Sequence, residues 1–442
     1  MNKRELAWIW FIEKYGLVLD WDFDGDIIEI ESCGDSYKII FDARKSHMDG
    51  KKLFIDRDPL NEIGQALSGE LDGEHDRPFL DELSDALFNM IRKFVVNDGG
   101  AIVWKRFWRN GSFSLCLTHD VDEIRKTYQF VTRSARFIMR RDFGSLIREI
   151  IALVDKLRGK DPYWTFDRIM EIEDRLGVRS SFYFLREKGK VKLRRRKSWR
   201  NIGRRYEFTD VEDVMKNLVD GGWDVGLHGS FDSYMDENLL KSEKEELEKV
   251  LGDRIVGIRQ HNLNLSIPKT WRIQERLGFE YDTTLGSNKD LSFRWGTCFP
   301  FYPIDNCRFS KVLQIPLIVE DIVLMRKERP WNELLRMIEI VKRHGGVLTI
   351  LWHHSVFGRD YPGWDEIYEK LIVHCKNEGA WVCSGKQILE WWKFRNKSKV
   401  FLDLGSKRID IFSEVPIVID SGGRYVVRES WEGRVGRYIW EE

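Results

Sequence analysis

Residues 115–122 read Leu-Cys-Leu-Thr-His-Asp-Val-Asp, an apolar run that ends in a histidine and two aspartates spaced two apart. If this run is a buried strand, Asp120 and Asp122 emerge together at its C-terminal end, where α/β folds place their ligands. Two carboxylates there can divide the work of a hydrolase, because one can hold a divalent metal while the other handles a proton. An aspartate also commonly caps the start of a helix, and a helix is predicted to begin near Glu123. Capping accounts for one aspartate and leaves His119 unexplained.

The stretch from residue 111 to about residue 394 alternates short apolar runs with helical segments. This alternation predicts parallel strands joined by crossover helices, and the number of runs suits a distorted (β/α) barrel of about seven strands. The predicted strands are Phe113 to Leu117, Ser181 to Leu185, Trp223 to Leu227, Ile255 to Ile258, Leu313 to Val319, Val347 to Leu351 and Ala380 to Cys383.

The flanking regions have different patterns. Residues 1–112 mix strand-like and helix-like segments, with a strand predicted from Tyr37 and an amphipathic helix over 79–95. Beyond residue 399, short apolar runs separated by turn residues predict antiparallel strands. We therefore expect an N-terminal α/β accessory domain at 1–112, a catalytic α/β domain at 113–394 and a C-terminal β appendage at 395–442.

The charge balance restricts the classes of partner. Lysine plus arginine number 72 and so do aspartate plus glutamate, and the pI is near 7.1, so no global electrostatic case exists for nucleic acid or an anionic membrane as the main partner. Charged residues make up 33% of the chain and glutamine is rare, which favours a heat-adapted source rich in surface ion pairs.

The N-terminus and the cysteines predict the compartment. Glu5 and Glu13 bracket only seven uncharged residues, too few for a signal peptide or a membrane-spanning helix. The six cysteines are dispersed without a Cys-x-x-Cys pair, which argues against a zinc ribbon and against a disulfide framework. We expect a cytoplasmic protein with no membrane span.

Other predicted strands also end in polar groups suited to metal binding. His228 and Asp232 follow the strand at 223–227, Arg259 and His261 follow the strand at 255–258, and His353 follows the strand at 347–351. Imidazole with carboxylate suits zinc, and a catalytic site needs three protein ligands with one open position. Asp122 and His228 are the first two candidates. Asp232, four residues after His228, competes with His261 for the third place, and the more rigid end of a strand slightly favours His261.

These motifs resemble those of the polysaccharide deacetylases of the NodB-homology type, carbohydrate esterase family 4, in the expected order over residues 113 to about 393. The sequence is most similar to the branch with an N-terminal extension and a Leu-Thr-His-Asp-Val-Asp first motif. The resemblance implies that Asp120 is the catalytic base, that Arg259 pairs with it, and that His353 is the general acid. It also implies that Asp122 and His228 bind the metal. Position 232 departs from the family, which has a second histidine there, and His261 stands where the family has proline.

The implied reaction is the hydrolysis of an N-acetyl group on a carbohydrate. A metal lowers the pKa of a bound water, Asp120 takes its proton as the water attacks the carbonyl, and His353 protonates the departing amine. The expected substrate is an N-acetylated saccharide precursor inside the cell, and the expected metal is zinc. His354 points away from His353 if the segment is extended, so we expect it to be structural.

Two other functions fit parts of the sequence. Asp120-Val-Asp122 is also a D-x-D sequence, by which many glycosyltransferases hold a metal and a nucleotide-sugar diphosphate, and the basic loop at 194–205 could serve the phosphates. Alternatively, the chain is a non-catalytic carbohydrate-binding relative that has lost its metal, since position 232 lacks the histidine.

Overall fold

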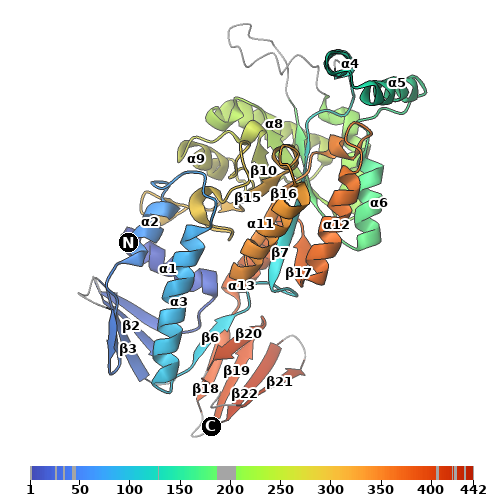
Figure 1. The fold of residues 1–442 in the computed structure, drawn as a ribbon. Helices are drawn as coiled ribbons and strands as arrows, with labels where there is room; N and C mark the ends of the chain where they lie inside the picture. Colours follow the sequence, from blue (N-terminus) through green and yellow to red (C-terminus); the bar gives the residue numbers. More distant parts are fainter. Residues whose placement is uncertain are drawn as a thin grey trace.

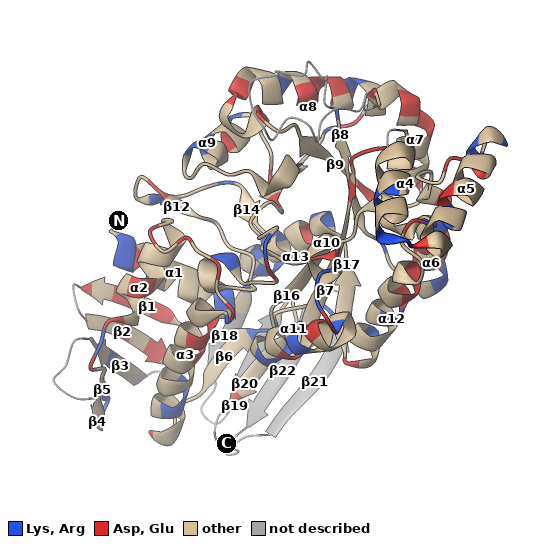
Figure 2. Cartoon of the chain, turned by 45° about the horizontal axis from the view of Figure 1, so that its top comes forward, with Lys and Arg blue, Asp and Glu red and all other residues tan. Residues whose placement is uncertain are grey.

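The computed structural model describes residues 2–24, 27–32, 35–41, 46–127, 129–186, 206–404, 408–420, 422, 426–432 and 435–441. A large parallel sheet surrounded by helices forms the middle of the chain, and smaller antiparallel or mixed sheets flank it (Figure 1). Acidic and basic residues are interspersed over most of the elements, in keeping with the balanced composition (Figure 2). The basic loop at 194–205 lies outside the described residues.

The central sheet has nine strands in the order β14-β11-β10-β9-β8-β7-β16-β15, with β17 paired to β7. β7 is the longest, and it has room for three neighbours: β16 along one edge, β17 beside its first half and β8 beside its second half. All nine of its residues are buried, as expected for a strand covered on both faces. The strands are β7 (Phe113–Val121), β8 (Ser181–Leu185), β9 (Asp224–Gly229), β10 (Gly257–Gln260), β11 (Tyr281–Asp282), β14 (Leu313–Gln314), β15 (Leu317–Glu320), β16 (Val347–Leu351) and β17 (Ala380–Cys383).

One bent segment, residues 313–320, brings the two edges of this sheet together. Its first part, β14, pairs with β11, and its second part, β15, pairs with β16. Pro316 stands at the bend, where its missing N–H costs no ladder bond. The sheet therefore curls into a distorted barrel, and the predicted fold class is confirmed. All seven predicted strands are present. The sheet has nine strands and not about seven, because the bend divides one predicted strand into β14 and β15 and because the two-residue β11 is too short to give a periodic signal.

Helices cover the outside of the curled sheet. In α6, for example, Phe166, Ile169 and Ile172 face the core, and Gly177 ends the helix at φ +64°, a left-handed conformation that glycine adopts without strain. No helix in the described part of the chain is long and apolar enough to cross a membrane. The helices are α4 (Gln129–Arg140), α5 (Phe143–Leu157), α6 (Phe166–Leu176), α7 (Glu212–Asp220), α8 (Glu237–Leu251), α9 (Lys269–Arg276), α10 (Asp321–Leu324), α11 (Pro330–His344), α12 (Trp364–Asn377) and α13 (Gly385–Lys397).

The N-terminal region combines helices with a five-stranded sheet in the order β1-β2-β3-β5-β4. The strand predicted from Tyr37 is β3, and the amphipathic helix predicted over 79–95 is α3. The elements are α1 (Lys3–Tyr15), β1 (Asp20–Asp24), β2 (Ile27–Ser32), β3 (Asp35–Ile40), β4 (His47–Asp49), β5 (Lys52–Phe54), α2 (Pro59–Leu67), α3 (Phe79–Asn97) and β6 (Ile102–Lys105).

The N-terminal region packs firmly against the barrel. Its hydrophobic core includes Trp271 and Trp295 of the barrel domain. Asp81 of α3 is fully buried and accepts hydrogen bonds from Lys14 Nζ at 3.0 Å, Thr297 Oγ1 at 2.8 Å and the Cys298 amide at 2.8 Å. One carboxylate thus ties α1, α3 and a barrel loop together.

The C-terminal segment forms a four-stranded antiparallel sheet in the order β18-β19-β22-β21. The predicted antiparallel strands are therefore present, but β20 leaves this sheet and pairs with β6 of the N-terminal region. The two ends of the chain are joined in this way, and the domain boundaries at 112 and 394 stay predictions. The remaining strands are β12 (Ile304–Asp305), β13 (Arg308–Phe309), β18 (Val400–Leu404), β19 (Arg408–Ser413), β20 (Ile417–Asp420), β21 (Val426–Glu432) and β22 (Val435–Glu441).

The Asp81 contact predicts a stability effect. Asp81→Ala leaves the buried Lys14 ammonium without its closest carboxylate, so we expect the free energy of unfolding to fall by about 3 kcal/mol in chemical denaturation. As a control, Glu70→Ala removes the exposed ion pair with Lys3 and should cost less than about 1 kcal/mol. Equal losses in the two variants would show that the Asp81 contact does not hold the regions together.

Candidate active site

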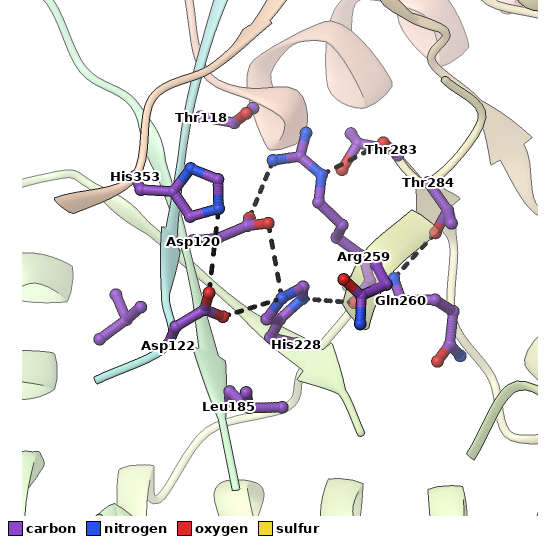
Figure 3. A network of polar contacts seen from close by, with 12 residues as sticks. Thr118, Asp120, Asp122, Leu185, His228, Arg259, Gln260, Thr283, Thr284 and His353 are labelled. Atoms are coloured by element: carbon purple, nitrogen blue, oxygen red, sulfur yellow. Dashed lines mark hydrogen bonds and ion pairs between the residues drawn. The ribbon is translucent and has the colours of Figure 1, made fainter. Parts of the chain in front are cut away.

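The polar residues predicted at the strand ends converge at the C-terminal end of the barrel (Figure 3). The sheet order places β10, β9, β8 and β7 side by side, and β16, which is distant in sequence, lies on the other side of β7. The site residues are Asp120 in β7, Asp122 just beyond it, His228 in β9, Arg259 in β10, His261 just beyond β10, and His353 just beyond β16.

Asp120 is held by a buried arginine. Arg259 Nη1 donates to Asp120 Oδ1 at 2.9 Å, and Arg259 Nε donates to the Thr283 carbonyl at 3.2 Å. Burial lowers the pKa of Arg259, but Asp120 together with Tyr183 and Cys116 raises it above its usual value. The guanidinium therefore stays charged, and its charge-assisted bond fixes the orientation of Asp120.

His228 presents one defined nitrogen to the carboxylates. Its Nδ1 lies 2.9 Å from the Arg259 carbonyl, which can only accept, so Nδ1 carries the proton. Nε2 lies 3.5 Å from Asp120 Oδ2 and 3.4 Å from Asp122 Oδ1. Burial lowers the pKa of His228, but the two carboxylates outweigh burial and raise it above its usual value. A cation bound between Nε2 and Asp122 would replace the proton that Nε2 carries in the charged imidazole.

Three groups at this place suit a metal ion. One ligand atom each of Asp122, His228 and His261 lie within 4.8 Å of one another. Ligands at metal distances of about 2.1 Å in a tetrahedron are about 3.4 Å apart, so a small closure of this group would bind zinc. Two imidazoles and one carboxylate are also the donor set that zinc accepts in catalytic sites.

The structure separates the two candidates for the third ligand. His261 is buried, and its ring centroid lies 5.3 Å from that of His228. Asp232 is exposed and stands at the start of a short 3₁₀ helix, Ser233–Met235, so in the described part of the chain it lies outside the metal-binding group. The geometry favours His261.

His353 is oriented by a carboxylate that the sequence analysis did not single out. His353 Nδ1 lies 2.8 Å from Asp321 Oδ1, and its backbone amide donates to Asp321 Oδ2 at 2.7 Å. Its Nε2 faces the site, 3.9 Å from Asp122 Oδ2. Burial lowers the pKa of His353, but the carboxylates of Asp321, Asp122 and Asp120 together raise it well above its usual value. Asp321 follows β15 directly, so the rule of polar residues at strand ends would have found it.

A neighbouring acidic group completes this side of the site. Glu320, Asp321 and His353 also form a group whose ligand atoms lie within 4.8 Å of one another. Burial raises the pKa of Glu320 to about 7, even though His353 acts in the opposite direction. Because both Asp321 oxygens are engaged by His353, we interpret this group as a support for the histidine.

The other two histidines of the motifs, His119 and His354, are fully buried. His119 alternates to the far side of β7, where its ring nitrogens meet the Trp352 carbonyl at 2.7 Å and Glu173 Oε1 at 3.0 Å. His354 is fully buried and stacks on Phe166, and burial lowers its pKa to about 4. Neither ring reaches the group around Asp122.

A cavity of about 450 Å³ lies next to this site, where Asn262 and Leu263 follow His261. Arg294 lines it and pairs with Asp72 of the N-terminal region at 2.9 Å. Asp72, Gly73 and Glu74 belong to the N-terminal region and line this cavity only through its long-range packing on the barrel. The cavity is lined by Asp72, Gly73, Glu74, Asn262, Leu263, Gly286, Ser287, Asn288, Lys289 and Arg294.

Comparison with known proteins finds similarity in structure only. No protein-family model and no curated protein matches this sequence. A proposed polysaccharide deacetylase from Mycobacterium smegmatis has a TM-score of 0.43 and 15% identity over 67% of this chain and 96% of its own. A carbohydrate esterase family 4 pseudoenzyme from Bacillus anthracis has a TM-score of 0.33 and 14% identity over 65% of this chain and 68% of its own. The peptidoglycan deacetylase PdaC from Bacillus subtilis has a TM-score of 0.32 and 11% identity, covering 65% and 94%. Two of these three proteins are named as deacetylases, and the other is named as a pseudoenzyme of carbohydrate esterase family 4.

The metal-binding group gives a second prediction. Asp122→Ala and His228→Ala should each abolish stoichiometric zinc, since a site with three protein ligands rarely survives the loss of one. His261→Ala should do the same, measured by metal analysis of the dialysed protein. Asp232→Ala is the matched control and should keep its zinc. If zinc is lost from the Asp232 variant and kept by the His261 variant, the third ligand has been assigned wrongly.

Proposed function

We propose that this protein is a metal-dependent deacetylase that hydrolyses the N-acetyl group of a carbohydrate. The observation that carries the proposal is the separation of two carboxylates only two residues apart. Asp120 is bound by Arg259, whereas Asp122 faces His228 and His261. One carboxylate is thereby free for proton transfer while the other belongs to the metal-binding group.

Asp122, His228 and His261 would hold the metal, and zinc suits their donor set. When bound, zinc lowers the pKa of a coordinated water and polarises a carbonyl oxygen. The proton on His228 Nδ1, held by the Arg259 carbonyl, keeps Nε2 as the donor atom.

Asp120 is the general base in this proposal. Its Oδ1 is occupied by Arg259, and its Oδ2 points toward His228 Nε2, which is the side where the metal-binding group lies. A proton taken up there comes from the attacking water. Because Arg259 is fully buried, its hydrogen bond to Oδ1 holds Asp120 in one orientation.

His353 is the general acid. Asp321 fixes its ring through Nδ1 and keeps it protonated, so Nε2 presents a proton toward the site. That proton goes to the amine nitrogen as its bond to the acetyl carbon breaks, and a free amino sugar and acetate are the products.

The polar cavity beside His261 is the proposed saccharide site. It offers amides, a hydroxyl and charged groups, which suit the hydroxyls of a sugar, and the N-terminal region supplies part of its wall. The cytoplasmic location, the heat-adapted source and an intracellular substrate stay predictions.

The two rival functions have less support. A glycosyltransferase would use both aspartates of its D-x-D sequence for one metal and its diphosphate, whereas here Arg259 binds Oδ1 of Asp120 and only Asp122 belongs to the metal-binding group of the described residues. A relative that has lost its metal would lack the third ligand, whereas His261 provides the imidazole that is missing at position 232.

The central test removes the proposed base without disturbing the metal. Asp120→Asn should keep zinc and fold but release acetate from N-acetylated saccharides more slowly by a factor on the order of 100 or more. His353→Ala should lose activity similarly. His354→Ala is the matched control on the adjacent residue and should mainly lower the unfolding midpoint, because it leaves a cavity beside Phe166. Near-normal acetate release by Asp120→Asn would contradict the proposed mechanism.

The cavity gives a separate kinetic prediction. Asn288→Ala removes a polar side chain from its wall, and we expect KM to rise about fivefold, the equivalent of one hydrogen bond, with kcat almost unchanged. Asn217→Ala, at an exposed position of α7, should change neither constant. If both KM and kcat are unchanged in Asn288→Ala, the saccharide binds elsewhere.

A further inference from the structure

The helical hairpin of α4 and α5 has its apolar side facing outward. In α5, apolar residues recur at intervals of four and three, which places them on one face of the helix. In a globular protein such a face normally packs on the core, yet its members are 69, 57, 55, 43, 39 and 80% exposed. They are Phe143, Ile147, Ile150, Ile151, Val154 and Leu157.

The opposite face of the hairpin is polar and is held by buried ion pairs. Glu149 of α5 binds Lys126 Nζ at 2.7 Å and Arg133 Nε of α4 at 2.9 Å, and Lys126 also binds Asp360 Oδ1 at 2.6 Å. Lys126 is fully buried, so rotating the apolar face inward would strip these charges of their partners. The outward direction of the apolar residues is therefore enforced by the rest of the structure.

α4 extends the apolar surface and the hairpin carries excess positive charge. Val131, Ile138 and Met139 of α4 are 72, 61 and 78% exposed. Residues 129–160 contain eight Lys or Arg and three Asp or Glu, a net charge of +5 in a chain whose net charge is 0.

All three acidic groups of this segment have local tasks. Glu149 faces inward, Asp142 caps α5 by accepting from the Ser145 amide at 3.0 Å, and Asp155 pairs with Arg359 at 2.6 Å. The solvent-facing side of the segment combines apolar side chains with six exposed bases and one exposed acid, Asp142. The bases are Arg136, Arg140, Arg141, Arg148, Arg158 and Lys160.

We propose that the α4–α5 hairpin docks on an anionic lipid bilayer, with its apolar side chains in the acyl boundary and its arginines at the lipid head groups. Apolar side chains flanked by basic ones are the recognition chemistry of an interfacial helix, and both components are needed for stable binding. The hairpin projects from the body of the molecule, so a flat surface can reach it (Figures 1 and 2).

Docking would place the candidate active site beside the bilayer. The hairpin begins a few residues after Asp122, and its anchor Asp360 follows His353 by seven positions, so both sides of the site connect to it. If the proposed deacetylation is correct, on which this step rests, the substrate is an N-acetylated sugar attached to a membrane lipid.

The test is flotation of the full-length protein with vesicles of phosphatidylcholine containing about 30% phosphatidylglycerol. The wild type should float with these vesicles, more weakly with phosphatidylcholine alone and more weakly at high salt. The triple variant Ile147→Ser, Ile150→Ser, Leu157→Ser should bind at least about tenfold more weakly. Arg136→Glu with Arg140→Glu should weaken binding to anionic vesicles specifically.

The matched control replaces three exposed apolar residues on other helices, Val219→Ser, Leu239→Ser and Val373→Ser, and should bind like the wild type. Circular dichroism checks that each variant is folded. Asp120→Asn should also float normally, which separates this proposal from the catalytic one. If the wild type fails to float, or if the hairpin triple variant floats equally well, the proposal is wrong. A wild-type dimer that the triple variant dissociates, without vesicle binding, would identify the surface as a self-association interface and overturn the proposal.

Discussion

The buried ion pair between Arg259 and Asp120 is the interaction around which the candidate site is built. The two residues lie on β10 and β7, which are separated in the sheet by β9 and β8, so the pair spans the interior of the curled sheet. Arg259 is completely buried, and a charge there is tolerable only with its partner in place. The intervening strand β9 contributes His228, whose ring is held by the carbonyl of the same arginine. Charge neutralisation in the core thus sets the position of the base and the tautomer of a proposed ligand together.

The barrel was predictable from sequence because its strands are short apolar runs that end in polar residues. Buried parallel strands are apolar on both faces, so the pattern survives without knowledge of their partners. The elements that the sequence could not show depend on distant partners: β11 has two residues, and the bend at Pro316 has meaning only because one segment pairs with both edges. The role of His119 shows the same limit. It stands next to Asp120, and the alternation of a strand sends it to Glu173 instead.

The sequence predicted which residues converge at the candidate site, but it did not predict the residues that orient them or line the neighbouring cavity. Asp120, Asp122, His228, Arg259, His261 and His353 converge as expected, since the C-terminal ends of parallel strands share one edge. The choice between Asp232 and His261 could not be made from spacing, because it depends on how each chain segment leaves its strand. Asp321 and the loop at 72–74 were missed for different reasons. Asp321 was missed because the predicted strand ended at Val319, one residue before the end of β15. The loop at 72–74 was missed because it reaches the cavity only through the packing of the N-terminal region on the barrel.

The need to pair buried charges explains both the arrangement of the site residues and the outward direction of the hairpin's apolar residues. In the site, buried charges are paired across the barrel and the apolar residues of the strands surround them. In the hairpin, the charges are also paired inward, through Lys126, Glu149 and Asp360, but the helices are too far from the core for their apolar faces to find cover. A chain with equal numbers of acidic and basic residues can therefore still present a local surface that is both apolar and positively charged. Its overall composition conceals this surface, because the acidic residues that balance the hairpin's arginines lie elsewhere in the molecule. A group of exposed apolar side chains like that of the hairpin is unfavourable in water. It is compatible with a stable fold when the ion pairs beneath hold the hairpin in place and a partner covers the apolar side chains.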